Sequence, residues 1–232
     1  MDLNDPNNRG KSLNTRFVNR VFTPDEQRQI FNSPHPDTVL WALWAGKETA
    51  YKIICKDDPG VSSSPRLYEV SLFQDWDSDR EECLFNGKSS FDGCVDTPNG
   101  RVHIRVFITR DYLHCTGTAD SVEAMDSVVW HTDNIGPVPQ SSPDYESMCV
   151  RNALKKHLSA YVDQGTNNIE IIREKGPRGL GPPLVYINGR QSDIDISLSH
   201  DGRFAAYAFT VFGNTCAAPV ENGTIKQCGL QH

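Results

Sequence analysis

VLWALWAGKETAYKIIC, residues 39–55, is apolar nearly all the way round when it is projected as a helix. Residues 33–37 (SPHPD), rich in proline, precede it and mark its start. A helix that is apolar on every side is typically buried, so we predict that this one lies in a core. Its charged residues Lys47, Glu48 and Lys52 then need an explanation. A buried charge is costly unless it is paired or bound to a cation.

Short patterned segments surround this helix in the first half of the chain. TPDE, residues 23–26, combines a capping residue, a proline at the first helical position and a glutamate at the third, which predicts a helix running to residue 31. Alternating apolar residues predict strands at 66–73 and 101–108, and a further strand is predicted at 112–117. Asn99-Gly100 is typical of a tight hairpin turn before the second strand.

The second half repeats this content after an unpatterned segment. Residues 150–162 have apolar positions at helical spacing, and strands are predicted at 169–173, 184–187, 194–198 and 203–212. Residues 130–147 are rich in Pro, Ser, Asp and Gly without periodicity. We therefore predict an α+β protein of two modules, residues 1–128 and 148–212, with a linker at 129–147 and a tail at 213–232.

Composition limits the classes of function. The net charge of −7 argues against a general nucleic-acid binder, and no apolar run is long enough for a membrane helix. The start, MDLNDPNNRGK, lacks the apolar segment of a signal peptide, and the 7 scattered cysteines contain no C-x-x-C pair. These features favour a cytoplasmic protein with free thiols.

A basic segment stands out on this acidic chain. Arg9, Lys11, Arg16 and Arg20 lie between Asp5 and Asp25 with no acidic residue among them. Such a segment is either a solvated face or a docking surface for an acidic partner.

Two groups of polar residues are candidates for chemistry. Glu48 and Lys52 are four residues apart on one helix face, which fits either an internal ion pair or a carboxylate that binds a cation. Asp2 offers a second carboxylate. SLSHDGR, residues 197–203, fits either a strand ending in an Asp-Gly turn or a ligand-binding segment.

The order of these pieces resembles a known family. WAGKETAYK (44–52) resembles the W-x-x-K-E-x-x-x-K helix of the 4′-phosphopantetheinyl transferase superfamily, and RFVNRVFTPDE (16–26) is similar to the segment before that helix in holo-acyl-carrier-protein synthases. Asp2-Leu3 looks like the opening strand of the same module, and DISLSHDGRFAAYAF (195–209) resembles the family's Ser-His segment. In two-module, surfactin-type members the Ser-His half comes first, so the order here looks reversed.

The resemblance implies a pseudo-dimer fold and a set of roles. Glu48 and Lys52 would be catalytic, and Asp2 with Glu48 would hold Mg²⁺. The implied contacts with coenzyme A come from Lys47, Lys52, Ser199, His200 and Arg203. The partner would be an acyl or peptidyl carrier protein of fatty acid or polyketide biosynthesis, docked on Arg9, Arg16 and Arg20. Its serine would be deprotonated by Glu48 or by a water molecule on the metal. A chain with both modules is expected to be a monomer with one site between its halves.

Three departures from the family pattern keep other readings open. Met1 directly precedes Asp2, Asn4 stands where two-module members often have a third carboxylate, and Gly181-Pro182-Pro183 lacks a basic residue that many members have. The rival readings are a degenerate binding protein for coenzyme A or a carrier protein, a member recruited to other chemistry, and an unrelated α+β domain.

Overall fold

The computed structural model describes residues 1–73, 89–137, 144–176 and 179–211. The chain divides into two compact units, Met1–Asp126 and Ser127–His232. Each unit combines antiparallel sheets with helices, which confirms the predicted α+β class. The predicted tail, residues 213–232, lies outside the described residues.

The first unit begins with three helices. These are α1 (Thr15–Val21), α2 (Pro24–Asn32) and α3 (Pro36–Asp57), with short 3-10 turns at Lys11–Leu13, Pro65–Leu67 and Val122–Ser127. The predicted capping box at α2 is present, because Thr23 accepts from the Glu26 N–H and Glu26 accepts from the Thr23 N–H. The predicted helix at 39–55 is confirmed as the greater part of α3.

The sheet of the first unit has four antiparallel strands in the order β1-β2-β3-β4. They are β1 (Glu69–Leu72), β2 (Ser89–Thr97), β3 (Gly100–Ile108) and β4 (Leu113–Thr118). The expected hairpin joins β2 to β3, with Thr97 opposite Gly100. The predicted strand at 66–73 is shorter than expected, since its first residues form a 3-10 turn.

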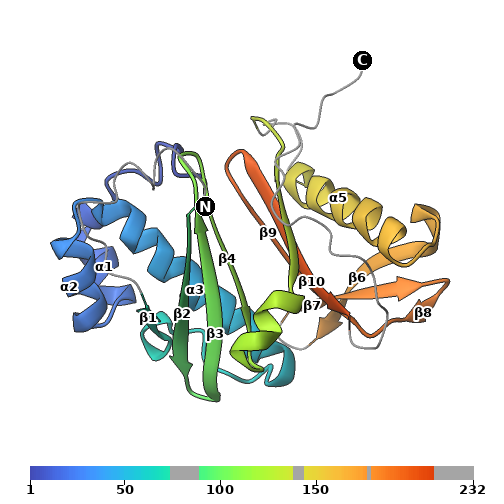
Figure 1. The fold of residues 1–232 in the computed structure, drawn as a ribbon, viewed down its shortest axis with the longest axis horizontal. Coiled ribbons are helices and arrows are strands. Elements are labelled where there is room, and N and C mark those ends of the chain that lie inside the picture. Colours follow the sequence, from blue (N-terminus) through green and yellow to red (C-terminus); the bar gives the residue numbers. More distant parts are fainter. Residues whose placement is uncertain (74–88, 138–143, 177–178, 212–232) are drawn as a thin grey trace. The chain divides into compact units, whose positions relative to one another are not determined.

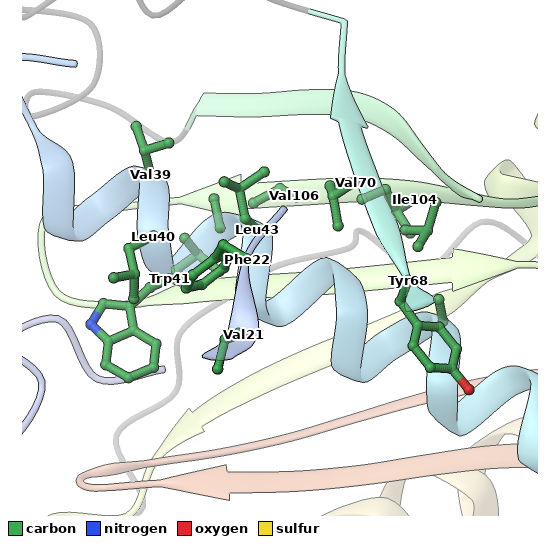
Figure 2. Packing of buried hydrophobic residues seen from close by; sticks show 14 of the residues in the cluster. Val21, Phe22, Val39, Leu40, Trp41, Leu43, Tyr68, Val70, Ile104 and Val106 are labelled. Atoms are coloured by element: carbon green, nitrogen blue, oxygen red, sulfur yellow. The ribbon is translucent and has the colours of Figure 1, made fainter. Parts of the chain in front are cut away.

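Helix α3 runs along this sheet (Figure 1) and supplies much of the first core. Figure 2 shows Leu43 and Phe22 in that core, with Val70 and Ile104 further along the helix. Gly46 allows a close approach, because a Cβ there would lie 3.0 Å from Cδ1 of Ile104. The helix therefore rests almost directly on the sheet at this point.

The second unit contains one α-helix, a short 3-10 turn at Thr166–Asn168 and two three-stranded sheets within its described residues. The helix is α5 (Tyr145–Tyr161), and the sheets have the orders β5-β10-β9 and β6-β7-β8. Their strands are β5 (Val129–Asn134), β6 (Ile169–Gly176), β7 (Gly179–Ile187), β8 (Arg190–Gln191), β9 (Ile194–Asp201) and β10 (Phe204–Val211). Val150, Leu154 and Leu158 of α5 pack with residues of these strands in a second core.

The predicted linker is wrong at both ends. Residues 129–134 form β5, which pairs with β10 from Val129 opposite Phe209 to Asn134 opposite Phe204, and α5 already starts at Tyr145. The sequence did not predict a strand at β5 because its residues are mostly polar, and polar side chains are rare inside a sheet unless they have partners. Here His131 Nε2 lies 3.0 Å from a carboxylate oxygen of Asp133 on the same strand.

Two predictions from composition can be compared with the described residues. None of the described helices is long and apolar enough to cross a membrane. The four cysteines in the described part of the chain, Cys55, Cys94, Cys115 and Cys149, are free thiols, as expected.

Candidate functional site

Lys47 lies in the core of the first unit. Its side chain is 2 % exposed, and Nζ lies 2.7 Å from Oε1 of Glu26. The same nitrogen donates to the carbonyls of Pro65 (3.1 Å) and Tyr68 (2.5 Å). An ammonium group has three N–H donors, and these three acceptors use all of them. In this structure these contacts occupy the donors that the expected contact between Lys47 and phosphate would need. Burial lowers the pKa of Lys47, and Glu26 opposes that shift.

Glu26 is the partner that sequence reasoning missed. Its carboxylate is fully buried and accepts from the backbone N–H of Thr23 (2.8 Å) and of Val70 (2.8 Å), besides Lys47. Val70 belongs to β1, an edge strand, so Glu26 also covers an N–H that would otherwise stay unpaired at the sheet edge. The capping pattern showed only one of these three contacts. The additional signal was the charge of Lys47, which lies in a helix whose residues are mostly apolar.

Other residues of the resembling motifs also have packing roles. The ring of Phe17 on α1 lies 5.9 Å from the ring of Trp44 and 6.3 Å from that of Trp41, centroid to centroid. Asn14 caps α1 by accepting from the Phe17 N–H at 3.0 Å. The first motif segment thus packs directly on α3.

Glu48 differs from its neighbour Lys47. It is only partly buried, and burial raises the pKa of its carboxyl group, while the nearby charge of Lys52 acts in the opposite direction. Groups with such perturbed pKa values are enriched at functional sites, although structural ion pairs also perturb them. The structure is therefore compatible with both interpretations of Glu48 and Lys52, an internal ion pair or a carboxylate that binds a cation.

Asp2 is held firmly although it lies close to the first residue. It is 2 % exposed, forms a β-bridge with Tyr112, and accepts from the Asn4 N–H through Oδ1 at 2.9 Å. Asn8 donates to the Asp2 carbonyl at 2.8 Å, and the Asn8 carbonyl accepts from the indole N–H of Trp41 on α3 at 2.8 Å. This chain of contacts ties the Asp2 segment to α3.

Strand β4 links the two candidate metal ligands. The Met1 amino group donates to the Leu113 carbonyl at 2.7 Å, and the Leu113 N–H donates back at 2.9 Å. Two residues further along β4, the Cys115 carbonyl accepts from the Thr49 hydroxyl at 3.3 Å. Asp2 and Glu48 are the direct neighbours of Met1 and Thr49, so both carboxylates come from segments that the same short strand holds.

The donor types fit a magnesium ion. Mg²⁺ is commonly bound by one or two carboxylates, with substrate phosphate and water completing the octahedron. Within the described residues there is no cluster of three His, Cys, Asp or Glu side chains that could hold a metal by itself. Asn4 adds no carboxylate, and its amide donates to Asp111 (2.9 Å) and accepts from Arg9 (3.1 Å). Asp2 and Glu48 are thus the candidate pair.

The three arginines expected to bind a partner are exposed. Arg16 and Arg20 lie one turn apart on α1, whose buried residues are Val18 and Val21. Arg9 precedes the first 3-10 turn and donates to Asn4. These positions are compatible with both interpretations of the basic segment, a solvated face or a docking surface for an acidic partner.

Ser199 and His200 lie on opposite faces of their sheet. They are adjacent on β9, opposite Ala206 and Ala205 of β10, and successive side chains of a strand point to opposite faces. Nδ1 of His200 lies 3.4 Å from Oε1 of Glu146 in the first turn of α5, a neighbour that the sequence did not reveal. The two side chains can therefore not act on a ligand from the same face. Arg203, the third residue of this group, lies with its guanidinium 5.3 Å from the ring centre of Phe204.

Comparison with protein families assigns the first unit. Residues 1–106 match the family model of the 4′-phosphopantetheinyl transferase superfamily. No match was found among the curated proteins or the solved structures. The match spans α1, α2, α3, β1, β2 and most of β3, so it includes Asp2, Glu26 and the Lys47-Glu48 helix.

This match confirms the resemblance to the 4′-phosphopantetheinyl transferase superfamily for residues 1–106. Members of this superfamily are transferases that generally use coenzyme A and Mg²⁺. Since the match ends at residue 106, the reversed order of the modules stays a prediction.

Proposed function

We propose that this chain is a magnesium-dependent 4′-phosphopantetheinyl transferase of the holo-acyl-carrier-protein synthase type. It would move the phosphopantetheine arm of coenzyme A to a serine of an acyl or peptidyl carrier protein. The observation that supports this most is the position of Glu48: it lies inside the superfamily match, partly buried, with a raised pKa. A buried carboxylate costs stability unless it is paired or bound to a cation. The burial of Glu48 therefore supports a role in binding a cation or accepting a proton.

The reaction exchanges one phosphorus–oxygen bond for another. The serine oxygen attacks the phosphorus that carries pantetheine, the bond from that phosphorus to the bridging oxygen breaks, and 3′,5′-adenosine bisphosphate leaves with the bond's electron pair. The serine proton passes to a base. Such a transfer depends mainly on positioning and on stabilising charge.

We assign these tasks to a few side chains. Asp2 and Glu48 would hold Mg²⁺, which when bound neutralises charge on the pyrophosphate. Lys52 would contact the pyrophosphate as a point charge. His200 would contact the 3′-phosphate, and Arg203 would lie near that phosphate. Lys47 has no part in this scheme because its donors are already used.

The partner would meet the exposed arginines. Carrier proteins that present an acidic surface would be attracted by Arg9, Arg16 and Arg20, which raises the rate of productive encounter. We also propose that one chain is sufficient for transfer, so that the protein acts as a monomer.

The test is direct incubation with coenzyme A, Mg²⁺ and a panel of apo carrier proteins, followed by intact-mass measurement. A carrier that gains one phosphopantetheine group supports the proposal, and omission of Mg²⁺ should abolish the gain. Asn4, which replaces a third carboxylate and is held by Asp111 and Arg9, favours the alternative of a binding protein without turnover. Binding of coenzyme A in a calorimeter, without any mass gain across the panel, would establish that alternative.

A further inference from the structure

The Glu26–Lys47 pair has more directional contacts than an ordinary ion pair. Lys47 donates to Glu26 and to two backbone carbonyls, and Glu26 accepts from Lys47 and from two backbone N–H groups. Both side chains are at most 2 % exposed. The pair thus connects α3 at one point with the start of α2 and with residues 65–70, which include the first residues of β1.

Apolar packing alone defines the rotation of α3 poorly. Five consecutive residues, 39–43, are buried, and five residues cover more than one full helical turn. Burial of apolar surface has no preferred direction, so the burial of this turn does not by itself favour one rotation of the helix. Directional contacts therefore add to the close packing of Gly46 on Ile104 in fixing the angle of the helix about its own axis.

The rotation of α3 controls the direction of Glu48. Residues along a helix are about 100° apart, so Glu48 follows Lys47 by slightly more than a quarter turn. A rotation of about 20° moves an atom that lies about 6 Å from the helix axis by about 2 Å. In enzyme active sites a misplacement of about 1 Å can cost about a hundredfold in rate. Small rotations of α3 would therefore matter to any reaction that uses Glu48.

We propose that the buried Glu26–Lys47 pair is a positioning device that fixes the rotation of α3 and thereby aims Glu48, so that Glu26 and Lys47 are positioning residues of the transfer reaction. This inference rests on the proposed function. Another directional contact of α3, from Trp41 to Asn8, lies nearer the start of the helix, and the Thr49 hydroxyl donates to the Cys115 carbonyl on the far side of Glu48. The ion pair is the buried contact on the other side of Glu48, and it carries more hydrogen bonds than the Thr49 contact.

The polarity of the surrounding backbone makes the pair different from a simple pair of charges. Glu26 faces two N–H donors and Lys47 faces two carbonyl oxygens. Exchange of the two side chains would put an ammonium group against N–H donors and a carboxylate against carbonyls. The reversed pair should therefore fail to replace the native one, whereas a simple ion pair would tolerate the exchange.

The test uses the double variant E26Q/K47M in the full chain. Both charges are removed, but the E26Q change keeps a carbonyl oxygen for one backbone N–H, and the K47M change keeps most of the apolar stem of lysine. The control is V95A, which removes only apolar contacts from the same core. At a temperature where circular dichroism shows all proteins folded, we expect E26Q/K47M to lose about a hundredfold in kcat, with KM for coenzyme A nearly unchanged.

The control separates positioning from stability. V95A should keep kcat near the wild-type value even if its unfolding midpoint falls as far as that of E26Q/K47M. Wild-type kcat in a folded E26Q/K47M variant would overturn the proposal. If that variant does not fold, E26Q alone gives the same comparison, because Lys47 then keeps its two carbonyl acceptors; an unchanged kcat in E26Q would overturn the proposal equally.

A structural measurement keeps this inference distinct from the proposed function. If the wild-type chain transfers nothing to any carrier, the proposed function fails, and the crystal structure of the double variant then decides about the pair. A rotated α3 with a displaced Glu48 carboxylate supports the positioning device. An α3 that superposes on the wild-type helix overturns it.

Discussion

Helix α3 takes part in two acid–base pairs, Lys47 with Glu26 of α2 and Glu48 with Lys52, and the two pairs differ in their contribution to the fold. Lys47 is buried with Glu26, and the described contacts use all three of its donors. Glu48, the next residue, has a pKa raised by burial that Lys52 offsets only in part. A buried charge is tolerated in a fold when it is paired and hydrogen-bonded, and it costs stability when it loses its partners. The comparison teaches that the Lys-Glu dipeptide of this motif combines a structural residue with a functional candidate.

The largest expected effect is on the stability of the first pair. Lys47→Met leaves the Glu26 carboxylate buried without its cation, which typically costs about 3–5 kcal/mol of unfolding free energy. Lys52→Met is the matched control, and it should cost less than about 1 kcal/mol because Lys52 is only partly buried. Urea denaturation followed by circular dichroism measures both values. Equal losses for the two variants would remove the distinction between the pairs.

The next effect concerns His200, which lies in the second unit. His200→Ala should weaken binding of coenzyme A by about 1.5–3 kcal/mol, the usual range for a hydrogen bond to a charged group. Binding of 3′-dephospho-coenzyme A should change little. Ser199→Ala is the control, because its side chain lies on the other face of β9. Equal losses for both ligands in calorimetry would show that His200 has a structural role, with Glu146 as its partner.

A smaller effect is expected at the basic segment. Reversal of both charges in Arg16→Glu/Arg20→Glu should raise KM for the carrier protein about tenfold and leave the affinity for coenzyme A nearly unchanged. Both residues are exposed, so the fold should tolerate the change. Arg173→Glu/Arg190→Glu provides the same change of net charge elsewhere on the exposed surface. A similar rise of KM in this control would mean that only the total charge matters.

The smallest effect is the stability of Glu48→Gln without metal. Burial raises the pKa of Glu48 in the folded protein above the unfolded value, so the protonated form favours folding. That contribution is complete below the unfolded pKa and is lost as the pH rises through the folded pKa. At pH 7, with a chelator present, Glu48→Gln should thus be at least as stable as wild type, and its advantage should shrink toward acid pH. A large loss of stability at pH 7 would mean that Glu48 and Lys52 form a structural ion pair.

The sequence predicted those helices and turns that short-range patterns of capping, apolar periodicity and turn residues specify. The capping box of α2, the buried helix α3 and the hairpin around Asn99 and Gly100 all follow from short-range rules, and the structure confirms them. Strand β5 was missed because its polar residues follow no apolar alternation and depend on the pairing with β10. Pairing between strands that are distant in the chain is not encoded in local periodicity.

The candidate site was predictable only in part, for a related reason. An all-round apolar helix does not indicate which side its charges face, so Lys47 and Glu48 looked equally available to a ligand. Only the tertiary structure brings Glu26 to Lys47 and Glu146 to His200. Residue types at motif spacing thus predicted the family of the first unit but not the division of tasks among the residues of the motif.

The central claim is that Glu48 serves transfer and contributes nothing to the fold. The most direct test is the single-turnover rate of phosphopantetheine transfer to an apo carrier protein, measured by intact mass at saturating Mg²⁺ for wild type and Glu48→Gln. We predict that the variant stays folded and loses about a thousandfold or more in rate, since loss of a group that stabilises transition-state charge costs several kcal/mol. A folded Glu48→Gln variant that transfers at nearly the wild-type rate would contradict the account.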